Sequence, residues 1–300
     1  MAKKNTAAAA TPVNTNDIVK KRSQFVEISK RFLQRKVAVI GLAVVILLIL
    51  VAVFANVIAP YDFAAQDIMN KLQFPSKAHW LGTDNFGRDI LTRMIYGGRT
   101  SLLVSLMGTV IALGIGSVIG AVSGFYSGTV DMIMMRLMDV LTAIPMTLLA
   151  VVVSAALGTG TWQTALAISI GGIAPTARML RASVLAIRNQ EFVEAARAYG
   201  SHDSRIIFKH VVPNCLAPLI VDSTLRLGGN IMAISGLSFI GLGVQPPAAE
   251  WGAMLNAGRP YIREFYPLIT FPGVAILLCM LGFNLFGDGL RDALDPKQKR

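Results

Sequence analysis

The sequence predicts an all-helical protein that crosses a membrane several times. Of its residues, 54% are hydrophobic and only 15% are charged, and the mean hydropathy is +0.57, a composition outside the norm for soluble domains. The hydrophobic residues gather in runs of about twenty, the length that a helix needs to cross roughly 30 Å of hydrocarbon. Lysine and arginine collect outside these runs, as they do at the borders of membrane spans.

Six hydrophobic runs are long enough to be transmembrane helices. They cover about residues 37–59, 100–123, 132–157, 162–180, 216–242 and 268–286. The run 162–180 is the weakest, because Pro175 and Arg178 interrupt its end, yet an even number of spans requires it. The first run follows a long polar and basic segment and is too long for the core of a signal peptide, so we expect it to remain in the mature protein.

The distribution of lysine and arginine predicts that both ends of the chain lie in the cytoplasm. The segment before the first run is the richest in these residues, and the segment after the fourth run and the C-terminal tail carry further sets. Positive charge marks cytoplasmic loops, so the loops near 60–99 and 243–267 should lie outside. The net charge of +11 then reflects membrane sidedness, and we expect no nucleic-acid partner.

Two segments of different character precede the first hydrophobic run. Residues 1–17 have the composition of a disordered basic tail, and for them a flexible tail that only fixes the topology is as good an explanation as a helix on the membrane surface. Residues 18–36 place Phe25, Phe32 and Leu33 among lysines and arginines, the pattern of an amphipathic helix on the cytoplasmic membrane surface. The membrane domain then extends over residues 37–300.

No catalytic or metal site is visible in the sequence. It lacks the G-x-x-x-x-G-K-[ST] loop that binds ATP phosphates and the H-E-x-x-H zinc motif, and its histidines, His79, His202 and His210, are far apart. Cys215 and Cys279 fall within hydrophobic stretches, so neither a disulfide framework nor a thiolate cluster is expected. We therefore expect a chain with no ATPase site, no bound cofactor and no metal.

The second hydrophobic run carries a stripe of glycines. Gly116, Gly120, Gly124 and Gly128 follow one another at a spacing of four residues, so they should lie on one helical face. Such small-residue faces let neighbouring helix backbones approach closely in membranes. The stripe therefore predicts helix packing rather than chemistry.

The segment 187–213 is charged and lies on the predicted cytoplasmic side. The stretch from Arg188 to Ala198 contains strong helix formers, and Gly200 tolerates the left-handed backbone that ends a helix. Ser201 is a plausible N-cap of a second short helix, with Asp203 near its positive end. The second helix would present apolar side chains that have no membrane to cover, which suits a groove on a cytoplasmic partner; these are Ile206, Ile207, Phe208 and Val211.

Ionisable residues inside predicted spans are expected to face the bundle interior or a path. Asp222, Arg226 and Asn230 recur at a spacing of four, so they should share one face, and Asp222 and Arg226 can pair. Two functions remain open for this face, a polar wall of a translocation path and a structural ion pair. Near the start of the third run, Arg136 and Asp139 predict an internal ion pair that holds a gate region, in preference to a contact with substrate.

The outer stretch 79–102 combines turn-forming residues with charged ones. Its part "GRDILTRMIY", residues 87–96, predicts a short amphipathic helix along the outer surface. The charged side chains could dock another protein, or they could serve only as local caps and salt bridges; they are Asp84, Arg88, Asp89 and Arg93.

Several motifs resemble one family of transport proteins. Glu194, Ala195, Ala196 and Gly200, with Pro213 at the matching distance, resemble the EAA loop with which permeases of ABC importers dock on their ATPase. The stretches 79–102, 236–255 and 283–296 resemble the C-type permease of the dipeptide, oligopeptide and nickel group. The resemblance covers nearly the whole chain from about residue 24.

This resemblance implies a fold, partners and a site. The fold would be that of a type I ABC-importer permease with six transmembrane helices, in a bacterial inner membrane. The partners would be a second, B-type permease, two ATP-binding subunits that use ATP and Mg, and an extracytoplasmic solute-binding protein. The loop 187–213 would couple ATP hydrolysis to import of peptides or a related small solute; its candidate coupling residues are Glu194, Ala195, Ala196, Gly200, Ser201, Asp203, Ile207 and Pro213. The alternative is a secondary transporter or channel that works without ATPase partners.

Overall fold

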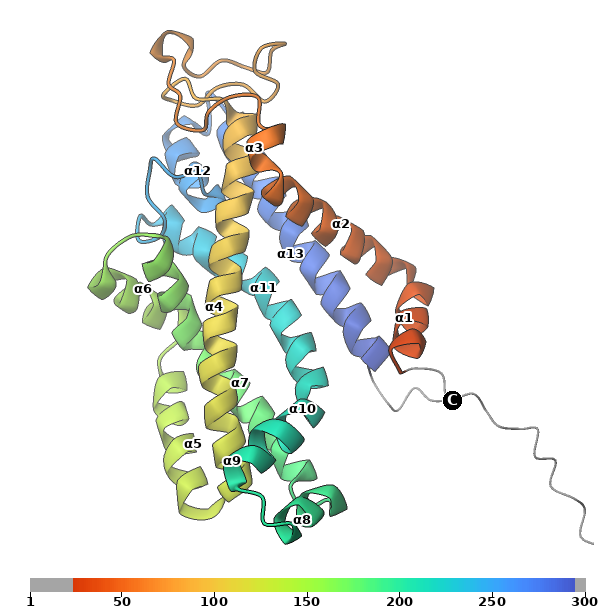
Figure 1. Cartoon of the computed structure of the whole chain (residues 1–300). Helices are drawn as coiled ribbons and strands as arrows, with labels where there is room; N and C mark the ends of the chain where they lie inside the picture. The colour runs from red at the N-terminus through yellow and green to blue at the C-terminus, as the bar shows by residue number, and fades with distance from the viewer. Residues whose placement is uncertain (1–23, 295–300) are drawn as a thin grey trace, which may run out of the picture.

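A computed structural model describes residues 24–294, and these residues are mostly helical (Figure 1). The helices of the first half are α1 (Gln24–Gln34), α2 (Lys36–Val53), α3 (Ala55–Ile58), η1 (Ile68–Asn70), α4 (Ile90–Tyr126), α5 (Gly128–Ala143) and α6 (Met146–Leu157). Those of the second half are α7 (Thr161–Ile187), α8 (Glu191–Ala198), α9 (Asp203–Arg205), η2 (Ile206–Val211), α10 (Val212–Asn214), α11 (Leu216–Phe239), α12 (Trp251–Gly258), η3 (Arg259–Tyr261) and α13 (Pro267–Leu294). The described residues contain no β-strand, only an isolated bridge between Thr83 and Asp89.

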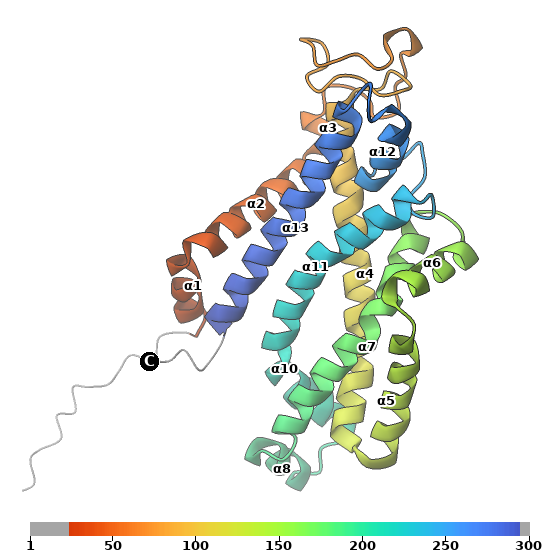
Figure 2. The same cartoon turned by 180° about the vertical axis from the view of Figure 1, so that it is seen from behind.

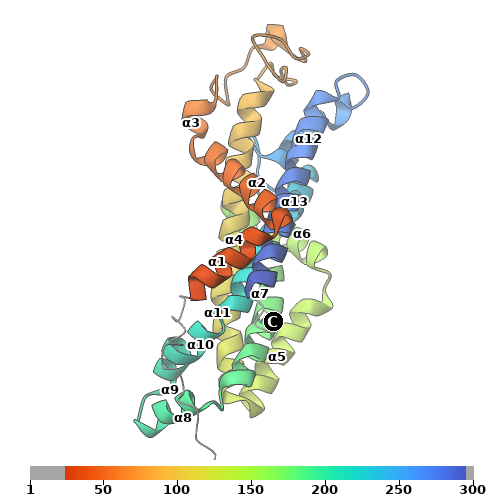
Figure 3. The same ribbon diagram turned by 90° about the vertical axis from the view of Figure 1, so that its right-hand side faces the viewer.

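The molecule is elongated, with loops and short helices at its two ends (Figures 1 and 2). The loop 60–89 and α12 lie at one end, and α8 and α9 lie at the other. Helix α4 runs along the molecule between these ends (Figure 3). Helices α2 and α13 pack against each other and diverge from α4, as Figure 1 shows. The residues between α7 and α11 are thus far from the loop 60–89, as the predicted sidedness requires.

Length and composition support fewer spans than the six predicted. Among the described residues, α2, α4 and α13 are each long and apolar enough to cross a membrane. Two bent pairs raise the number to five if each is one span: α5 with α6, bent by 87°, and the segment 203–214 with α11, bent by 65°. The run 162–180 lies in α7, which is long but contains Pro175 and Arg178. The sixth crossing therefore stays a prediction for α7.

Helix α4 corrects the prediction of a separate outer helix. Residues 87–96 and the run 100–123 fall largely within one continuous helix of 37 residues. The carboxylate of Asp89 caps its start by accepting from the backbone N–H of Thr92 at 2.8 Å. Gly97 and Gly98 do not interrupt the helix, because the ring of Trp251 fills the space beside them. Tertiary packing here overrides the low helix propensity of glycine.

The glycine stripe packs α4 against α7, as predicted, at three of its four positions. A Cβ on Gly116, Gly120 or Gly124 would come within 2.9 Å of a backbone oxygen of α7. Gly128 is different, since it begins α5 with φ +59° and has open space around it. The stripe ends there because α4 stops at Tyr126.

The predicted third span is sharply bent. Helix α5 ends at Ala143, and α6 begins at Met146 after an 87° change of direction. Pro145 lacks the N–H that would continue the helix, and its ring favours extended backbone at Ile144, whose φ and ψ are −92° and 127°. The bend at Pro145 is large enough to divide the predicted third span into two helices.

Helix α1 packs against the end of α13. Phe32 is buried and its ring meets that of Phe286 edge to face at 5.7 Å, while Arg35 pairs with Asp292 at 3.1 Å. The helix ends at Gln34, two residues before the end of the predicted amphipathic helix 18–36. Its placement on a membrane surface stays a prediction. The predicted tail 1–17 and residues 18–23 of that helix lie outside the described residues.

Candidate functional site

The segment between α7 and α11 forms two short helices joined at a glycine. Helix α8 covers Glu191–Ala198, and the second helical stretch runs from Asp203 through η2 to Asn214. Gly200 has φ +72°, a conformation that glycine adopts at no steric cost, and its N–H donates to the carbonyl of Arg197 at 2.9 Å. The predicted pair of helices with a glycine at their junction is confirmed. We call the segment 191–214 the coupling segment.

The starts of both short helices differ from the prediction. Helix α8 begins at Glu191 rather than Arg188, because Gln190 is extended, with φ −81° and ψ 152°. The N-cap of α9 is His202 and not Ser201, since Asp203 is the first helical residue. Asp203 lies in the first turn, where a negative charge is favourable. His202 makes no side-chain capping bond, so the turn is set by Gly200.

One face of the coupling segment is buried against the ends of α4 and α7. Val193, Ile206 and Val211 are fully buried, and Ile207 is only 2% exposed. They pack with Phe125 and Ala121 of α4, with Leu180 and Val184 of α7, and with Cys215 and Leu219 at the start of α11. The prediction that Ile206, Ile207 and Val211 fill a groove on a partner is therefore wrong. The α4 and α7 ends themselves supply the apolar surface that these residues cover.

The opposite face of the coupling segment is exposed. Tyr199 is 90% exposed and Phe208 52%, although apolar surface of this size favours burial. Glu194 and Ala195 of the EAA motif are exposed as well, whereas Ala196 is partly buried. Of the remaining candidate coupling residues, Gly200, Asp203 and Pro213 are exposed and Ser201 is partly buried. The segment thus exposes carboxylates and aromatic side chains on one face, while its other face is packed against α4 and α7.

Arginines fasten this segment and the end of α7 to the turn between α4 and α5. Arg188 donates to the carbonyls of Gly124 and Phe125 at 3.4 Å each and also to the Oγ of Ser127. The guanidinium of Arg197 lies 5.0 Å from the ring centroid of Phe125, within range of a cation–π interaction. These contacts were not predicted, because a positive charge at a span end already has an explanation in membrane sidedness.

The predicted pair of Asp222 and Arg226 forms on α11. The Nη2 atom of Arg226 lies 2.6 Å from the Oδ2 atom of Asp222, and both side chains are largely buried. Asn230 does not extend this polar face, since its side chain is buried and donates to the Oγ1 of Thr109 on α4 at 2.9 Å. Asn230 is therefore a contact between helices.

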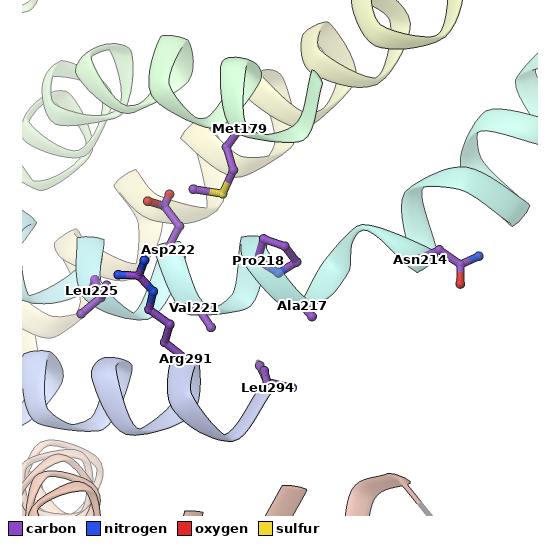
Figure 4. A pocket seen from close by; sticks show the side chains of 9 residues that line it. All are labelled: Met179, Asn214, Ala217, Pro218, Val221, Asp222, Leu225, Arg291 and Leu294. Carbon is purple, nitrogen blue, oxygen red and sulfur yellow. The ribbon is translucent and has the colours of Figure 1, made fainter. Parts of the chain in front are cut away.

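A pocket of about 620 Å³ lies between α7, α11 and α13. Figure 4 shows Asp222 and Met179 on one side of it and Arg291 on another. The residues that line it are Met179, Asn214, Ala217, Pro218, Val221, Asp222, Leu225, Arg291 and Leu294. Asp222 is thus the member of the predicted polar face that reaches an open space.

The predicted ion pair between Arg136 and Asp139 is wrong. Asp139 instead pairs with Arg178 of α7, with Nη2 and Oδ1 at 2.9 Å. The same nitrogen donates to the Oγ1 of Thr142 at 2.8 Å and to the carbonyl of Met138 at 3.4 Å, so Arg178 has three polar contacts on α5. Arg136 is exposed and has no ion-pair partner among residues 24–294. The spacing of residues within one helix predicts only pairs within that helix, and the partner of Asp139 belongs to another helix.

The charged residues of the outer stretch serve local structure. Asp84, Arg88, Asp89 and Arg93 are each at most 4% exposed. The carboxylate of Asp84 accepts from the N–H of Phe86 and from both the N–H and the Nε of Arg88, at 2.6–2.9 Å. Because these side chains are buried and satisfied, they are not available to dock another protein, and the local-cap alternative is supported.

Among the described residues, no group of three His, Cys, Asp or Glu side chains is placed to hold a metal ion. Cys215 and Cys279 are both buried free thiols. The exposed face of the coupling segment, with its carboxylates and aromatic side chains, is therefore the candidate site, and it is suited to binding another protein.

Comparisons with known proteins agree along almost the whole chain. Residues 116–300 match the family described as "Binding-protein-dependent transport system inner membrane component". Residues 23–75 match the family described as "N-terminal TM domain of oligopeptide transport permease C". Together these matches cover both the N-terminal helices and the region that holds the coupling segment.

Individual relatives are similar over at least 90% of their length. The dipeptide transport system permease protein DppC of Alkalihalophilus pseudofirmus is 43% identical, over 91% of this chain and 90% of its own length. The glutathione transport system permease protein GsiD of Pectobacterium atrosepticum is 41% identical, over 93% of both chains. The oligopeptide transport system permease protein OppC of Bacillus subtilis is 40% identical, over 98% of this chain and 96% of its own length.

A solved structure shares the fold. The MetNI methionine ABC transporter in an inward-facing conformation matches with a TM-score of 0.54 and 18% identity. The match covers 68% of this chain and 97% of the other chain. The matched part of this chain therefore has the fold of the matched chain of that transporter.

Proposed function

Because this chain belongs to the family of binding-protein-dependent transport system inner membrane components, we propose that it is a permease subunit of an ATP-driven peptide importer. The observation that carries the proposal is the coupling segment, whose one face is packed into the helix ends and whose other face is exposed. Relatives named as permeases support this function over a secondary transporter or channel. The chain itself contributes the membrane path and leaves ATP hydrolysis to other subunits.

The complex that we propose contains four kinds of subunit. A second permease of the B type would complete the path, two ATP-binding subunits would use ATP and Mg, and a solute-binding protein would deliver the cargo from outside. The family description, which names binding-protein-dependent transport, supports the last of these.

We propose a peptide or a related small solute as the cargo, moved into the cytoplasm. The support is chemical likeness among the relatives, which are named for dipeptides, oligopeptides and glutathione. Asp222 borders the pocket between α7, α11 and α13 and could line the path. Its pairing with Arg226 equally suits a structural ion pair, so an Arg226→Gln variant should be assayed for cargo preference.

The coupling segment would act as a rigid contact for an ATP-binding subunit. Glu194, Ala195 and Tyr199 would touch the partner, because they are exposed on one face. Ile207 is buried, so it would act by holding the segment on α4 and α7. Because its inner face is packed against α4 and α7, a displacement of the segment would be passed to these helices. Packed cores shift between discrete arrangements and do not deform continuously.

Co-purification tests the docking surface directly. The tagged chain would be purified in mild detergent from cells that produce all subunits, with Tyr199→Asp compared with Met69→Asp. Both residues are strongly exposed, at 90% and 92%, but Met69 lies in the loop at the opposite end of the molecule. We expect Tyr199→Asp to lose the ATP-binding subunits and keep the second permease, whereas Met69→Asp keeps both. Equal retention of the ATP-binding subunits in both variants would contradict the proposed docking surface.

A further inference from the structure

The turn between α4 and α5 joins more elements than a simple connection would. Helix α4 ends at Tyr126, Ser127 has φ +55° and Gly128 has φ +59°, so the chain reverses within two residues. A positive φ is unfavourable for serine and persists where surrounding contacts hold it. We call residues 123–131 the α4–α5 turn.

Asp131 ties this turn to α7. Its two carboxylate oxygens meet the Nε and Nη2 atoms of Arg181 at 2.5 and 2.6 Å, the bidentate geometry that gives arginine–carboxylate pairs their directional strength. The Oγ of Ser123 donates to the same carboxylate. The Asp131 side chain is only 16% exposed. The pair is therefore oriented by several contacts and is not a loose surface pair.

A second arginine of α7 extends the attachment along α5. Arg178 stands three residues before Arg181 and pairs with Asp139, which lies eight residues after Asp131, about two helical turns. Next to the pair of Arg178 and Asp139, Met138 packs with Ala174 and Ala177 of α7. Helix α5 is thus fixed to α7 over more than half of its length.

The same turn also touches the coupling segment and the residue before it. Phe125 is buried with Val193 and Ile206 and lies beneath the guanidinium of Arg197. Arg188 binds the carbonyls of Gly124 and Phe125 and the hydroxyl of Ser127. The α4–α5 turn therefore contacts the end of α7, the coupling segment and the start of α5 at once.

We propose that Asp131 is a positioning residue for coupling, which makes α5 move as one body with the coupling segment. The inference rests on the proposed function, since it assumes that an ATP-binding subunit pushes on this segment. Without the pair of Asp131 and Arg181, a displacement of the coupling segment would still reach α7 and α11 by direct connection. It would reach α5 less completely, because only the pair of Arg178 with Asp139 and the packing of Met138 would then hold α5 on α7.

The transport assay uses the full complex reconstituted with its binding protein. The measured quantity is solute transported per ATP hydrolysed, for Asp131→Asn, Asp131→Arg, Arg181→Asp and the exchanged pair Asp131→Arg with Arg181→Asp. Coupling between sites is typically worth about 5- to 150-fold, so we expect each single variant to lower the ratio at least about fivefold. The exchanged pair should recover much of it. Asp292→Asn is the control, because it removes another pair between segments, Arg35 with Asp292, away from the turn.

A distance measurement separates positioning from simple stability. Spin labels would be placed at Leu137→Cys on α5 and Ser204→Cys on α9, both of which are exposed, while the native cysteines are buried. The distance distribution should be narrow and the same without nucleotide and with ATP. In Asp131→Asn it should broaden or shift on ATP binding. The Asp292→Asn control should keep the narrow distribution.

The outcomes distinguish this inference from the function on which it rests. An unchanged transport ratio in Asp131→Asn and in both charge reversals would overturn the positioning function of Asp131 alone. Loss of the ATP-binding subunits from these variants, with transport and hydrolysis falling together, would also overturn it, since Asp131 would then serve assembly. A wild-type complex that hydrolyses ATP without moving any peptide, or that contains no ATP-binding subunit, would overturn the proposed function and this inference with it.

Discussion

Glycine sets how closely α4 and α7 approach each other. At Gly120, an added Cβ would lie 2.3 Å from the backbone oxygen of Ala177, a distance at which one of the helices must shift. This contact could be predicted, because a four-residue glycine spacing has one simple explanation in a membrane helix. The pair of Asp222 and Arg226 could be predicted for a similar reason, since spacing within one helix determines it. The pair of Arg178 and Asp139 could not, because it depends on how two helices pack.

Replacing Gly120 by alanine should destabilise the protein. Overpacking of a close contact costs about 1–3 kcal/mol, and here the neighbour is backbone that cannot rotate away. Gly114 is a matched control on the same helix, because nothing lies within 4 Å of its would-be Cβ. Gly114→Ala should be neutral or raise stability by up to about 1 kcal/mol through helix propensity. Thermal unfolding in detergent would measure both, and equal midpoints for the two variants would contradict the packing that we describe.

At the scale of helices, the sequence predicts where helices exist better than where they end. Residues 87–96 were expected to be a separate helix, but Asp89 caps a helix that continues to Tyr126. The apolar face of the coupling segment was expected to bind a partner protein, because the sequence does not show that the ends of α4 and α7 cover this face. Both errors concern surfaces that only the assembled helices create. Proline, by contrast, acts locally, so the bend before α6 could be predicted from Pro145 alone.

Replacing Pro145 by alanine should reduce the bend between α5 and α6. Ile144 would no longer be steered away from helical backbone, and a restored N–H could continue the helix. We expect assembly with the other subunits to persist and transport to fall, since α6 would leave its packing against α7. Pro272→Ala is the control, because Pro272 lies inside α13, which continues past it. Spin-label distances between α5 and α6 would detect the change, and an unaltered distance would show that the bend is held by packing rather than by proline.

At the scale of the molecule, the positive charges predict a topology that the fold makes possible. The loop 60–89 and the coupling segment lie at opposite ends (Figure 1), which requires an odd number of crossings between them. If α4 and the bent pair of α5 and α6 each cross once, α7 would supply the third crossing, which stays a prediction. Its sequence was the weakest of the six predicted spans, because it contains Arg178 and Arg181. The structure explains these charges, since both arginines pair with acidic residues of α5.

Accessibility of engineered cysteines would test the crossing by α7. Thr159, in the turn before α7, and Tyr199, after it, are both exposed, and the native cysteines are buried. We expect a membrane-impermeant thiol reagent to label Thr159→Cys from outside the inner membrane and Tyr199→Cys only from the cytoplasm. Met69→Cys should behave like Thr159→Cys. Labelling of Thr159→Cys and Tyr199→Cys from the same side would mean that α7 does not cross.

The two faces of the coupling segment place different demands on the sequence. The inward residues, such as Val193 and Ile206, must suit α4 and α7 of their own chain. The outward residues Glu194, Tyr199 and Phe208 are exposed, so packing within the described chain does not restrict their side chains. If the outward face is the docking surface that we propose, exchanging a few of its side chains would let the same transmembrane helices bind a different ATP-binding subunit without a change of fold.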